Sequence, residues 1–346
     1  MVPFFSIVMP VFNAEKYIVR AVNSITCQRY KNFELIIVDD CSQDSSLALC
    51  KQLKKNDSRI KVISLEKNMG AAHARNVGIS VSAGIYIGFV DADDYVDDDV
   101  LNTAYKELYK DYPDCLKFGA IEEYYAGDNL IYSKQYTLED NSYEGVSINR
   151  QIVYMEEVPL FGYMWNGFYK RSIIDKYGIK VDESRKVNED FAFNIEYFLH
   201  VENLKCISCS GYHYMKGNPS SLSNTTSNYT YNDHLVKINS LLSLWENNPP
   251  QDIMKIIFWM YTRFILSLLT YNKDRSYASL VKLLDMIYDD NLYKKFLSFN
   301  IKFNSIKKKF LVNLLKSQNA IVIYMFILLI RLIRFKCAKL FLMIKK

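Results

Sequence analysis

The sequence predicts an α/β fold in which a mostly parallel β-sheet is flanked by helices and followed by a helical C-terminal region. Within the first 125 residues, short runs rich in Val, Ile and Phe alternate with segments of helical periodicity. These runs are apolar on both faces, which is typical of parallel strands covered by helices on both sides of a sheet. From about residue 232 onward, the apolar spacing is helical throughout.

Each element of the first 125 residues follows from its own pattern. The first helix is expected over residues 14–28, with Tyr17, Ile18 and Ile25 on one face and Asn13 as its N-cap. A loop rich in Asp and Ser precedes the second helix, and the fourth strand runs directly into an acidic cluster. The expected strands cover residues 5–10, 33–38, 60–65 and 85–90, and the other two helices cover residues 45–55 and 71–80.

The length of 346 residues leaves room for two domains. We expect an α/β domain over residues 1–230 and a helical region over residues 231–346. Inside the first domain, residues 126–160 are polar and rich in Tyr, with weak periodicity. Short elements are expected over residues 162–177 and a helix over residues 189–201.

The net charge of +5 is unevenly distributed along the chain. Residues 291–346 hold 13 of the 43 Lys and Arg residues and no Asp or Glu. Residues 1–290 hold the other 30 together with all 38 acidic residues, a net charge of −8. An acidic body with a basic, apolar tail indicates an anionic partner for the tail, either a membrane or a nucleic acid.

The tail, about residues 303–346, favours a membrane surface. Residues 317–330 carry no charge, but a membrane-spanning helix needs about 20 apolar residues. Beyond them, Arg331, Arg334, Lys336 and Lys339 recur at helical spacing among apolar residues, as in a basic amphipathic helix lying at a membrane surface. The alternative is an apolar helix packed on the rest of the protein. The basic residues alternate with aliphatic ones rather than with stacking aromatics, so nucleic acid is not expected as a partner.

The cysteines and the N-terminus indicate a reduced, cytosolic setting. Seven scattered cysteines do not form a disulfide framework. Cys206 and Cys209 have the spacing of half a zinc site, but no second pair completes it. The apolar N-terminal run contains Pro10 and lacks a basic region, so it reads as a strand and not as a secretory signal.

Polar residues follow each of the four predicted strands. In a parallel sheet the carboxyl ends of the strands share one edge, where ligands bind, so these residues should meet there. They supply several carboxylates and one guanidinium, which suits a ligand with both hydrogen-bond donors and negative charge. Asp91, Asp93 and Asp94 could also hold a hard divalent cation together with phosphate oxygens of a substrate. The four groups are Pro10–Asn13, Asp39–Asp44, Glu66–Gly70 with Ala74–Gly78, and Asp91–Asp94.

Taken together, these four groups resemble glycosyltransferase family 2, the inverting nucleotide-sugar transferases of the GT-A fold. The resemblance is strong over residues 4–125 and weaker to about residue 225. It implies a nucleotide-sugar-binding half over residues 1–125, an acceptor-binding half over residues 126–230, and a divalent cation, Mn²⁺ or Mg²⁺. It further implies that Asp91 contacts the ribose and that Asp93 holds the cation. The residues implied to line the uracil pocket are Pro10, Phe12, Asp40 and Arg75.

A base for the acceptor is expected near residue 190. Glu189 and Asp190 open a predicted helix and are similar to the Glu-Asp motif that carries the catalytic base in this family. Direct displacement with inversion needs a carboxylate that takes the proton from the attacking hydroxyl. We assign this role to Asp190, with Glu189 orienting it or binding an acceptor hydroxyl. The structural alternative is that two acids favour a helix N-terminus through the helix macrodipole.

Three further residues are candidates from looser parts of the family pattern. Trp165 is either an aromatic platform for a sugar or a buried core residue. His213 is either a metal ligand or a hydrogen-bonded core histidine. Lys216 stands where relatives often have Arg near the diphosphate; Lys keeps the charge but loses the bidentate fork.

The resemblance implies transfer of a hexose or N-acetylhexosamine from a UDP-sugar to a hydroxyl of a glycan or glycolipid acceptor. Bacterial capsule, exopolysaccharide or lipopolysaccharide synthesis is the expected setting, on the cytoplasmic face of the cell membrane. One alternative, a sugar-nucleotide-forming nucleotidyltransferase, should have a Gly-rich basic loop after its first strand, where this chain has Pro10–Asn13. A dehydrogenase would need a G-x-G-x-x-G motif there. Intact Asp93 and Asp190 argue against the remaining alternative, a non-catalytic binding protein.

Overall fold

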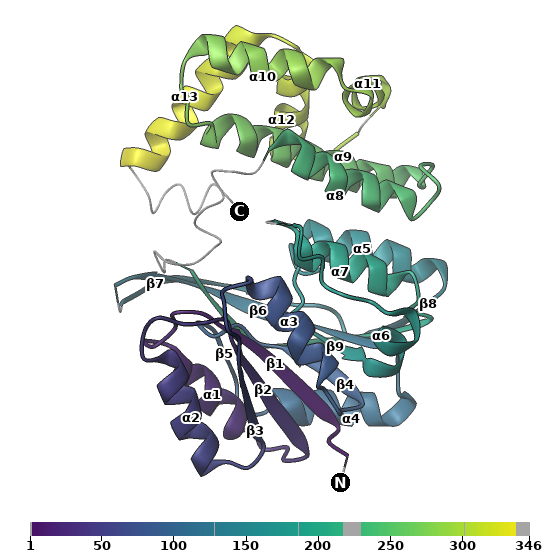
Figure 1. The fold of residues 1–346 in the computed structure, drawn as a ribbon. Helices are drawn as coiled ribbons and strands as arrows, with labels where there is room; N and C mark the ends of the chain where they lie inside the picture. Colours follow the sequence, from purple (N-terminus) through teal and green to yellow (C-terminus); the bar gives the residue numbers. More distant parts are fainter. Residues whose placement is uncertain (1, 128, 186, 217–229, 301, 337–346) are drawn as a thin grey trace. The chain divides into compact units, whose positions relative to one another are not determined.

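The computed structural model describes residues 2–127, 129–185, 187–216, 230–300 and 302–336 (Figure 1). The chain forms two compact units, Met1–Ser221 and Leu222–Lys346. The division falls within residues 217–229, which lie outside the described residues, so the expected boundary at residue 230 stays a prediction. The first unit contains the sheet, and in the described part of the second unit every regular element is a helix.

The first half of the sheet is parallel, as expected. Its spatial order is β3-β2-β1-β4, with β1 between β2 and β4. Every residue of β1 and of β2 is buried, which explains their continuous apolar runs. These four strands confirm the predicted ones to within one or two residues. They are β1 (Phe5–Val11), β2 (Phe33–Asp39), β3 (Ile60–Ser64) and β4 (Tyr86–Phe89).

The second half of the sheet makes it mixed rather than mostly parallel. The order continues β9-β6-β10-β5, and β9 is antiparallel to both of its neighbours. Two further strands pair at the side, β7 with β6 and β8 with β10. These strands are β5 (Tyr95–Val96), β6 (Cys115–Ala126), β7 (Asn129–Tyr136), β8 (Asn141–Glu144), β9 (Gly167–Lys170) and β10 (Asn203–Lys216).

Residues 126–160 are more regular than their weak periodicity indicated. They contain the end of β6, the strands β7 and β8, and the helix α5 (Val146–Glu157). Most residues of β7 and β8 are exposed or half-buried, so neither strand needs the alternation of apolar and polar residues that marks a strand with one buried face. The periodicity was therefore an unreliable guide in this region.

The helices predicted over residues 45–55, 71–80 and 189–201 are present, whereas the helix predicted over residues 14–28 starts later, and the helices at residues 100–111 and 146–157 were not predicted. Helix α1 begins at Ile18, not at residue 14, and its N-cap position is Tyr17. Asn13 instead has a positive φ of 49°, and its side-chain oxygen accepts a hydrogen bond from the Gln43 amide. The helices are α1 (Ile18–Thr26), α2 (Ser46–Asn56), α3 (Ala71–Ser80), α4 (Val100–Asp111), α5, α6 (Arg171–Tyr177) and α7 (Glu189–Phe198).

The second unit is built around the helix α9 (Gln251–Tyr271), which contacts α8, α12 and α13. By length and hydropathy alone α9 could cross a membrane, and it is the one such helix in the described ranges; just over half of it is buried, as in a core helix. Arg331 of α13 donates hydrogen bonds to the carbonyls of Leu269 and Thr270, so its charge lies against the C-terminal end of α9. The other helices are α8 (Tyr231–Ser243), α10 (Tyr277–Asp289), α11 (Asn291–Ser298), α12 (Ile306–Lys316) and α13 (Ala320–Lys336).

Candidate active site

The carboxyl ends of β1, β2 and β4 bring the first predicted site residues to one edge of the sheet. Pro10 of β1 is buried and pairs with Val38 of β2, whereas Phe12, just beyond β1, is 48% exposed. Asp40, just beyond β2, is buried, and its two carboxylate oxygens accept hydrogen bonds from the amides of Met69 and Gly70, each at 2.7 Å. Asp40 therefore fixes the loop that leads into α3.

Arg75 joins this edge to the next strand. It lies in α3, which packs on β1 and β2 (Figure 1), and its side chain is only 7% exposed. Its Nη2 donates a hydrogen bond to Asp91 Oδ1 at 2.9 Å. Asp91 is the second residue after the end of β4. The guanidinium thus holds the first carboxylate of the acidic cluster.

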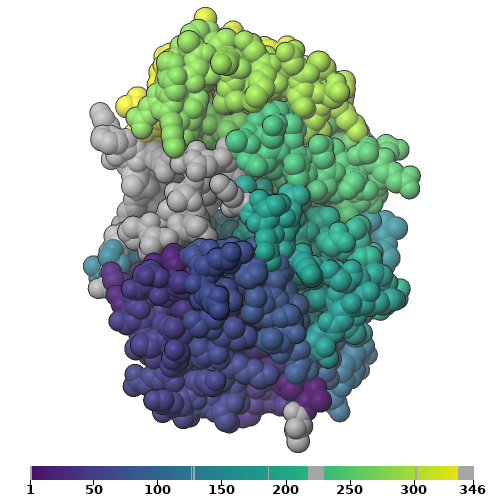
Figure 2. Space-filling model, viewed as in Figure 1, coloured from purple at the N-terminus to yellow at the C-terminus, as the bar shows by residue number. Residues whose placement is uncertain are grey.

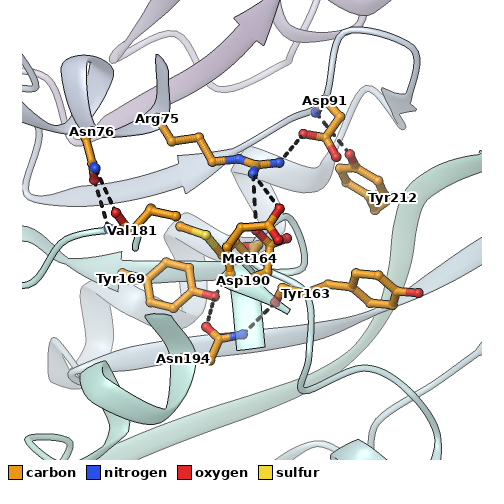
Figure 3. A network of polar contacts seen from close by, with 11 residues as sticks. Arg75, Asn76, Asp91, Tyr163, Met164, Tyr169, Val181, Asp190, Asn194 and Tyr212 are labelled. Atoms are coloured by element: carbon orange, nitrogen blue, oxygen red, sulfur yellow. Dashed lines mark hydrogen bonds and ion pairs between the residues drawn. The ribbon is translucent and has the colours of Figure 1, made fainter. Parts of the chain in front are cut away.

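The same guanidinium also contacts the predicted base. Arg75 Nη1 lies 3.2 Å from Asp190 Oδ1 and 3.7 Å from Glu189 Oε1, both in the first turn of α7 (Figure 3). About 100 residues separate Asp91 from Asp190 in sequence, yet one side chain bridges them. The structure therefore brings together three of the predicted site carboxylates around Arg75.

The electrostatics of this cluster differ from residue to residue. Burial raises the pKa of Asp190; Arg75 opposes this shift, Glu189 and Asp91 add to it, and the pKa reaches about 7. Burial by itself would lower the pKa of Arg75, but Asp190, Asp91 and Glu189 outweigh it and raise that pKa. A carboxyl group that titrates near neutral pH is suited to accept a proton and to release it again.

Contacts beside Arg75 fix α3 against the segment that leads to α7. The Asn76 side chain donates to the Val181 carbonyl and accepts from the Val181 amide, both at 2.8 Å. Asn76 also donates to Glu183, which contacts His73 at 3.0 Å. In Figure 2 the blue residues of the N-terminal part and teal residues from the middle of the chain lie side by side on one face. These contacts explain how Asp190 reaches Arg75.

The carboxylates after β4 have separate partners. Asp94 is fully buried, and it accepts hydrogen bonds from the Tyr212 hydroxyl and the Met215 amide. Asp91 is held by Arg75, and Asp93 is partly exposed. In the described ranges, no three His, Cys, Asp or Glu side chains are grouped closely enough to hold a metal ion by themselves. A divalent cation at Asp93 fits this arrangement if substrate phosphate oxygens supply further ligands, as is common for Mg²⁺ and Mn²⁺.

Trp165 is buried, which contradicts the sugar-platform alternative. It is 4% exposed, and its ring stacks on Tyr212 and Tyr163 at centroid distances of 4.2 and 4.6 Å. Because a platform needs an exposed ring face, the structure supports the core alternative for this residue.

His213 and Lys216 both contact carboxylates in this structure. His213 Nδ1 lies 3.0 Å from Glu123, and its Nε2 lies 3.1 Å from Asp97. With both ring nitrogens engaged, the structure favours the hydrogen-bonded alternative for His213 over metal ligation. Lys216 Nζ forms an ion pair with Glu122 at 2.6 Å, so its predicted diphosphate contact stays a prediction.

A comparison with models of protein families shows which family has this arrangement. The model described as glycosyl transferase family 2 matches residues 6–178, half of the chain, and the match spans β1, α3 and the acidic cluster. The chain belongs to glycosyl transferase family 2. The fold is accordingly the GT-A fold, as the resemblance implied, with the helical unit following it.

Similar proteins include glycosyltransferases of bacteria. The uncharacterized glycosyltransferase EpsJ of Bacillus subtilis is 29% identical over 237 residues, 68% of each chain. The poly(ribitol-phosphate) β-N-acetylglucosaminyltransferase TarS of Staphylococcus aureus is 28% identical over 213 residues, 61% of this chain and 35% of TarS. The chain therefore spans about a third of the TarS length in that match.

Solved structures share the fold. A crystal structure of S. aureus TarS residues 1–349 with UDP has a TM-score of 0.63 and 20% identity, covering 92% of this chain and 89% of that one. The same TarS fragment with UDP-GlcNAc has a TM-score of 0.62. At this identity the likeness shows the GT-A fold and nothing finer.

Two residues that contact the acidic cluster Asp91–Asp94 were not predicted from the sequence. Tyr212 is buried, and its hydroxyl contacts both Asp94 and the Asp91 amide. Arg20 of α1 donates to the Asp93 carbonyl at 2.7 Å and lies over the Tyr95 ring. Tyr212 adjoins His213, which the sequence did single out, but no spacing ties Arg20 to Asp93, which is 73 residues away.

Proposed function

We propose that this chain is a metal-dependent, inverting glycosyltransferase that moves a hexose or N-acetylhexosamine from a UDP-sugar to an acceptor hydroxyl. The observation that carries the proposal is the bridge by Arg75 between Asp91 and Asp190, because it places a donor-side carboxylate beside a base candidate. The TarS structures with UDP and UDP-GlcNAc support a UDP-sugar as donor.

The donor would bind at the strand edge. Pro10 and Phe12 would pack against the uracil, and Asp91 would accept a hydrogen bond from the ribose. Asp40 already accepts two amide hydrogen bonds, but a carboxylate has about four lone-pair sites and can also accept the uracil imide N–H. Because Asp40 is fixed by Met69 and Gly70, it would not need to reorient on binding.

Asp190 would act as the base. Its carboxylate would take the proton from the acceptor hydroxyl as that oxygen attacks the anomeric carbon, and the bond to the UDP oxygen breaks. Arg75 would orient Asp190 and favour its ionised form. Mn²⁺ or Mg²⁺ held at Asp93, when bound, would neutralise charge on the departing diphosphate.

A panel of UDP-sugars tests this function. With Mn²⁺ and a glycan or lipid-linked acceptor, we expect UDP release from at least one donor. Asp190→Asn should lower the rate by about a hundredfold or more, since the base is lost. Asp175→Asn is the matched control, because Asp175 is an exposed acid paired with Arg171 in α6. If no donor yields UDP, the proposed enzyme activity is wrong.

We also propose an anionic membrane surface as a partner of the second unit. Helix α13 has a buried side with Ile323 and Ile327 and an opposite, exposed apolar stripe. Helix α12 adds exposed Ile306 and Phe310, and Phe310 packs edge-on against Phe326 of α13. Thirteen Lys and Arg and no acids in residues 291–346 suit anionic lipid headgroups. The stripe consists of Ile321, Val322, Met325, Leu329 and Leu332.

This partner fits the expected setting of a peripheral enzyme on the cytoplasmic face of a bacterial membrane, acting on a lipid-linked glycan of capsule, exopolysaccharide or lipopolysaccharide. One B. subtilis relative is named a putative teichuronic acid biosynthesis glycosyltransferase, TuaG. Arg331 faces α9, so the basic residues that would meet lipid are others, such as Lys307 and Lys309 of α12.

Vesicle flotation tests the membrane proposal. The full chain should float with phosphatidylglycerol vesicles, and the double variant Met325→Glu, Leu329→Glu should not. The matched control is Val236→Glu with Met286→Glu, two comparably exposed apolar residues of α8 and α10. Flotation that survives the α13 variant, or is lost equally in the control, contradicts the assignment of this stripe.

A further inference from the structure

Lys117 is a charged side chain with no access to solvent. It lies in β6, is 0% exposed, and is not one of the site residues assigned above. Burying an ammonium group is costly, and an apolar side chain of similar size would usually serve stability as well or better. The presence of a lysine at this position therefore calls for a reason other than stability.

All three N–H donors of Lys117 have acceptors. Nζ lies 2.8 Å from the Tyr163 carbonyl, 3.1 Å from Asn166 Oδ1 and 2.9 Å from the Tyr169 hydroxyl. Gly167, directly opposite Lys117 in the β6–β9 ladder, leaves space for it, since a Cβ there would come within 3.1 Å of the lysine side chain. Both the hydrogen-bond acceptors and the space at this position therefore suit a lysine side chain.

Two buried amides extend this network toward the base. The Tyr169 hydroxyl donates to Asn194 Oδ1 at 2.7 Å, and Asn194 Nδ2 donates to the Tyr163 carbonyl (Figure 3). Asn194 Nδ2 also donates to the Phe161 carbonyl. Asn194 lies in α7, one turn after Asp190. On the other side, Asn166 Nδ2 donates to the carbonyls of Leu160 and Phe118. Residues 160–166 are therefore tied to β6 and to α7.

Met164, within residues 160–166, contacts Asp190 directly. The Met164 amide hydrogen-bonds to the Asp190 carboxylate, and Met164 is the neighbour of Tyr163, whose carbonyl binds Lys117. Lys117 and Asp190 also interact electrostatically. One network thus fixes both the helix that carries Asp190 and the amide that binds its carboxylate.

We propose that Lys117 is a positioning residue for Asp190, acting through residues 160–166 and through Tyr169 and Asn194. It touches neither substrate nor the reacting atoms. The proposal rests on the proposed function, in which Asp190 is the base. Under this proposal, the geometry of the base depends on a residue of β6, a strand that contains none of the motifs of the family resemblance.

The charges around the two groups set the expected pH effect. Asp190 is faced by Arg75 of α3, Glu189 of α7, Asp91 after β4 and Lys117 of β6. Lys117 is faced by Cys115 of β6, Cys206 of β10, Glu156 of α5 and Asp190. Burial lowers the pKa of Lys117 to about 8, so its positive charge is largely present at neutral pH. Loss of that charge would raise the pKa of Asp190 further.

The test compares Lys117→Met with Lys205→Met in the full chain. Lys205 lies in the adjacent strand β10 and pairs with Glu107, so the control removes the same charge without touching the network. For Lys117→Met we expect kcat to fall about tenfold or more, because small displacements of a reacting group are costly. The KM for the donor should stay within about twofold, and the acid limb of kcat should move up by about half a pH unit.

A second variant covers the case in which Lys117→Met does not fold. Tyr169→Phe keeps the ring and removes only the hydroxyl between Lys117 and Asn194, and it should lower kcat several-fold with unchanged KM. A folded Lys117→Met, or in its absence Tyr169→Phe, with wild-type kcat and acid limb overturns the inference. If Asp190→Asn is inactive in that case, the proposed function stands; if Asp190→Asn is active, the base assignment and the inference both fail.

Discussion

Arg75 connects residues that lie far apart in the sequence, and it does so from a buried position. Its two terminal nitrogens contact Asp91 at one side and Asp190 with Glu189 at the other. Arginine suits this role because its planar guanidinium presents several donors in fixed directions and stays charged when buried. The residue that the resemblance assigned to the uracil pocket therefore also holds the base candidate.

The raised pKa of Asp190 predicts a pH dependence. Below about pH 7 the carboxyl is protonated and cannot accept the hydroxyl proton, so kcat/KM should fall about tenfold per pH unit. A folded pKa above the unfolded value of about 3.9 also means that ionisation costs stability as pH rises from about 4 to about 7. Asp190→Asn should therefore raise Tm more at pH 8 than at pH 5. A flat rate profile between pH 5 and 8 contradicts the assignment.

The carboxylates after β4 predict separate effects of metal on activity and on folding. In the part of the chain that the structure describes, no three ligating side chains form a preassembled site, so the cation should contribute little to the fold. EDTA should abolish UDP release, and Mn²⁺ should restore it, while Tm changes by less than about 1 °C. Asp93→Asn should reproduce the loss of activity. A large fall in Tm on chelation would show that the metal is structural.

At the scale of elements, α3 determines how the site is assembled. It carries Arg75 and Asn76 on neighbouring positions, and it approaches β1 closely at Gly78. A Cβ at Gly78 would lie 2.3 Å from Val8 Cγ1, so only glycine allows the helix to pack at this distance. The strand β1 and the helix α3 are thus fitted to one another, and the position of Arg75 depends on that fit.

The close approach predicts a coupling between Gly78 and Val8. Gly78→Ala should destabilise the protein by about 1–3 kcal/mol, because the added methyl group overpacks a buried contact. Adding Val8→Ala should recover part of this loss, which a double-mutant cycle from denaturant unfolding would measure. Ser80→Ala, on the exposed end of α3, is the control and should be neutral. Additive effects of Gly78→Ala and Val8→Ala would contradict the predicted contact.

At the scale of the whole molecule, the two units differ in net charge: residues 1–221 hold 24 Lys and Arg and 31 Asp and Glu, a net −7, whereas residues 222–346 hold 19 and 7, a net +12. The acidic residues lie before residue 291, and several of them surround Arg75 or follow β4. The last 56 positions, which contain helices α11 to α13, hold basic residues and no acidic ones. The exposed apolar stripe of α13 lies in the same part of the chain. Each unit thus has the charge that its proposed partner requires, a cation with a nucleotide in one case and anionic lipid in the other.

This charge distribution predicts that membrane binding is salt-dependent. Because the Debye length falls from about 30 Å at 0.01 M salt to about 3 Å at 1 M, attraction to phosphatidylglycerol vesicles should weaken strongly over that range. Binding to phosphatidylcholine vesicles, which lack net charge, should be weaker throughout. Sedimentation with each vesicle type measures both. Equal binding to both lipids at all salt concentrations would show that the basic residues play no part.

The sequence by itself determined the parallel strands, the helices between them and the residues at the strand ends. These follow from local patterns, since a doubly buried strand must be apolar throughout and a ligand edge must be polar. The resemblance supplied Arg75 and Asp190 as separate candidates. The strands β7 and β8 were not predicted, because exposed strands do not need the alternation of apolar and polar residues that marks a strand with one buried face.

Tertiary structure alone decided which candidates meet. Residues 75, 91 and 190 come together only because α3 packs on β1 and Asn76 fixes the Val181 segment. Tertiary packing also buried Trp165 against Tyr212 and enclosed Lys117, whose neighbours in sequence give no sign of its partners. Such contacts join positions tens of residues apart, and local periodicity carries no information about them, because it records only which face of an element is buried.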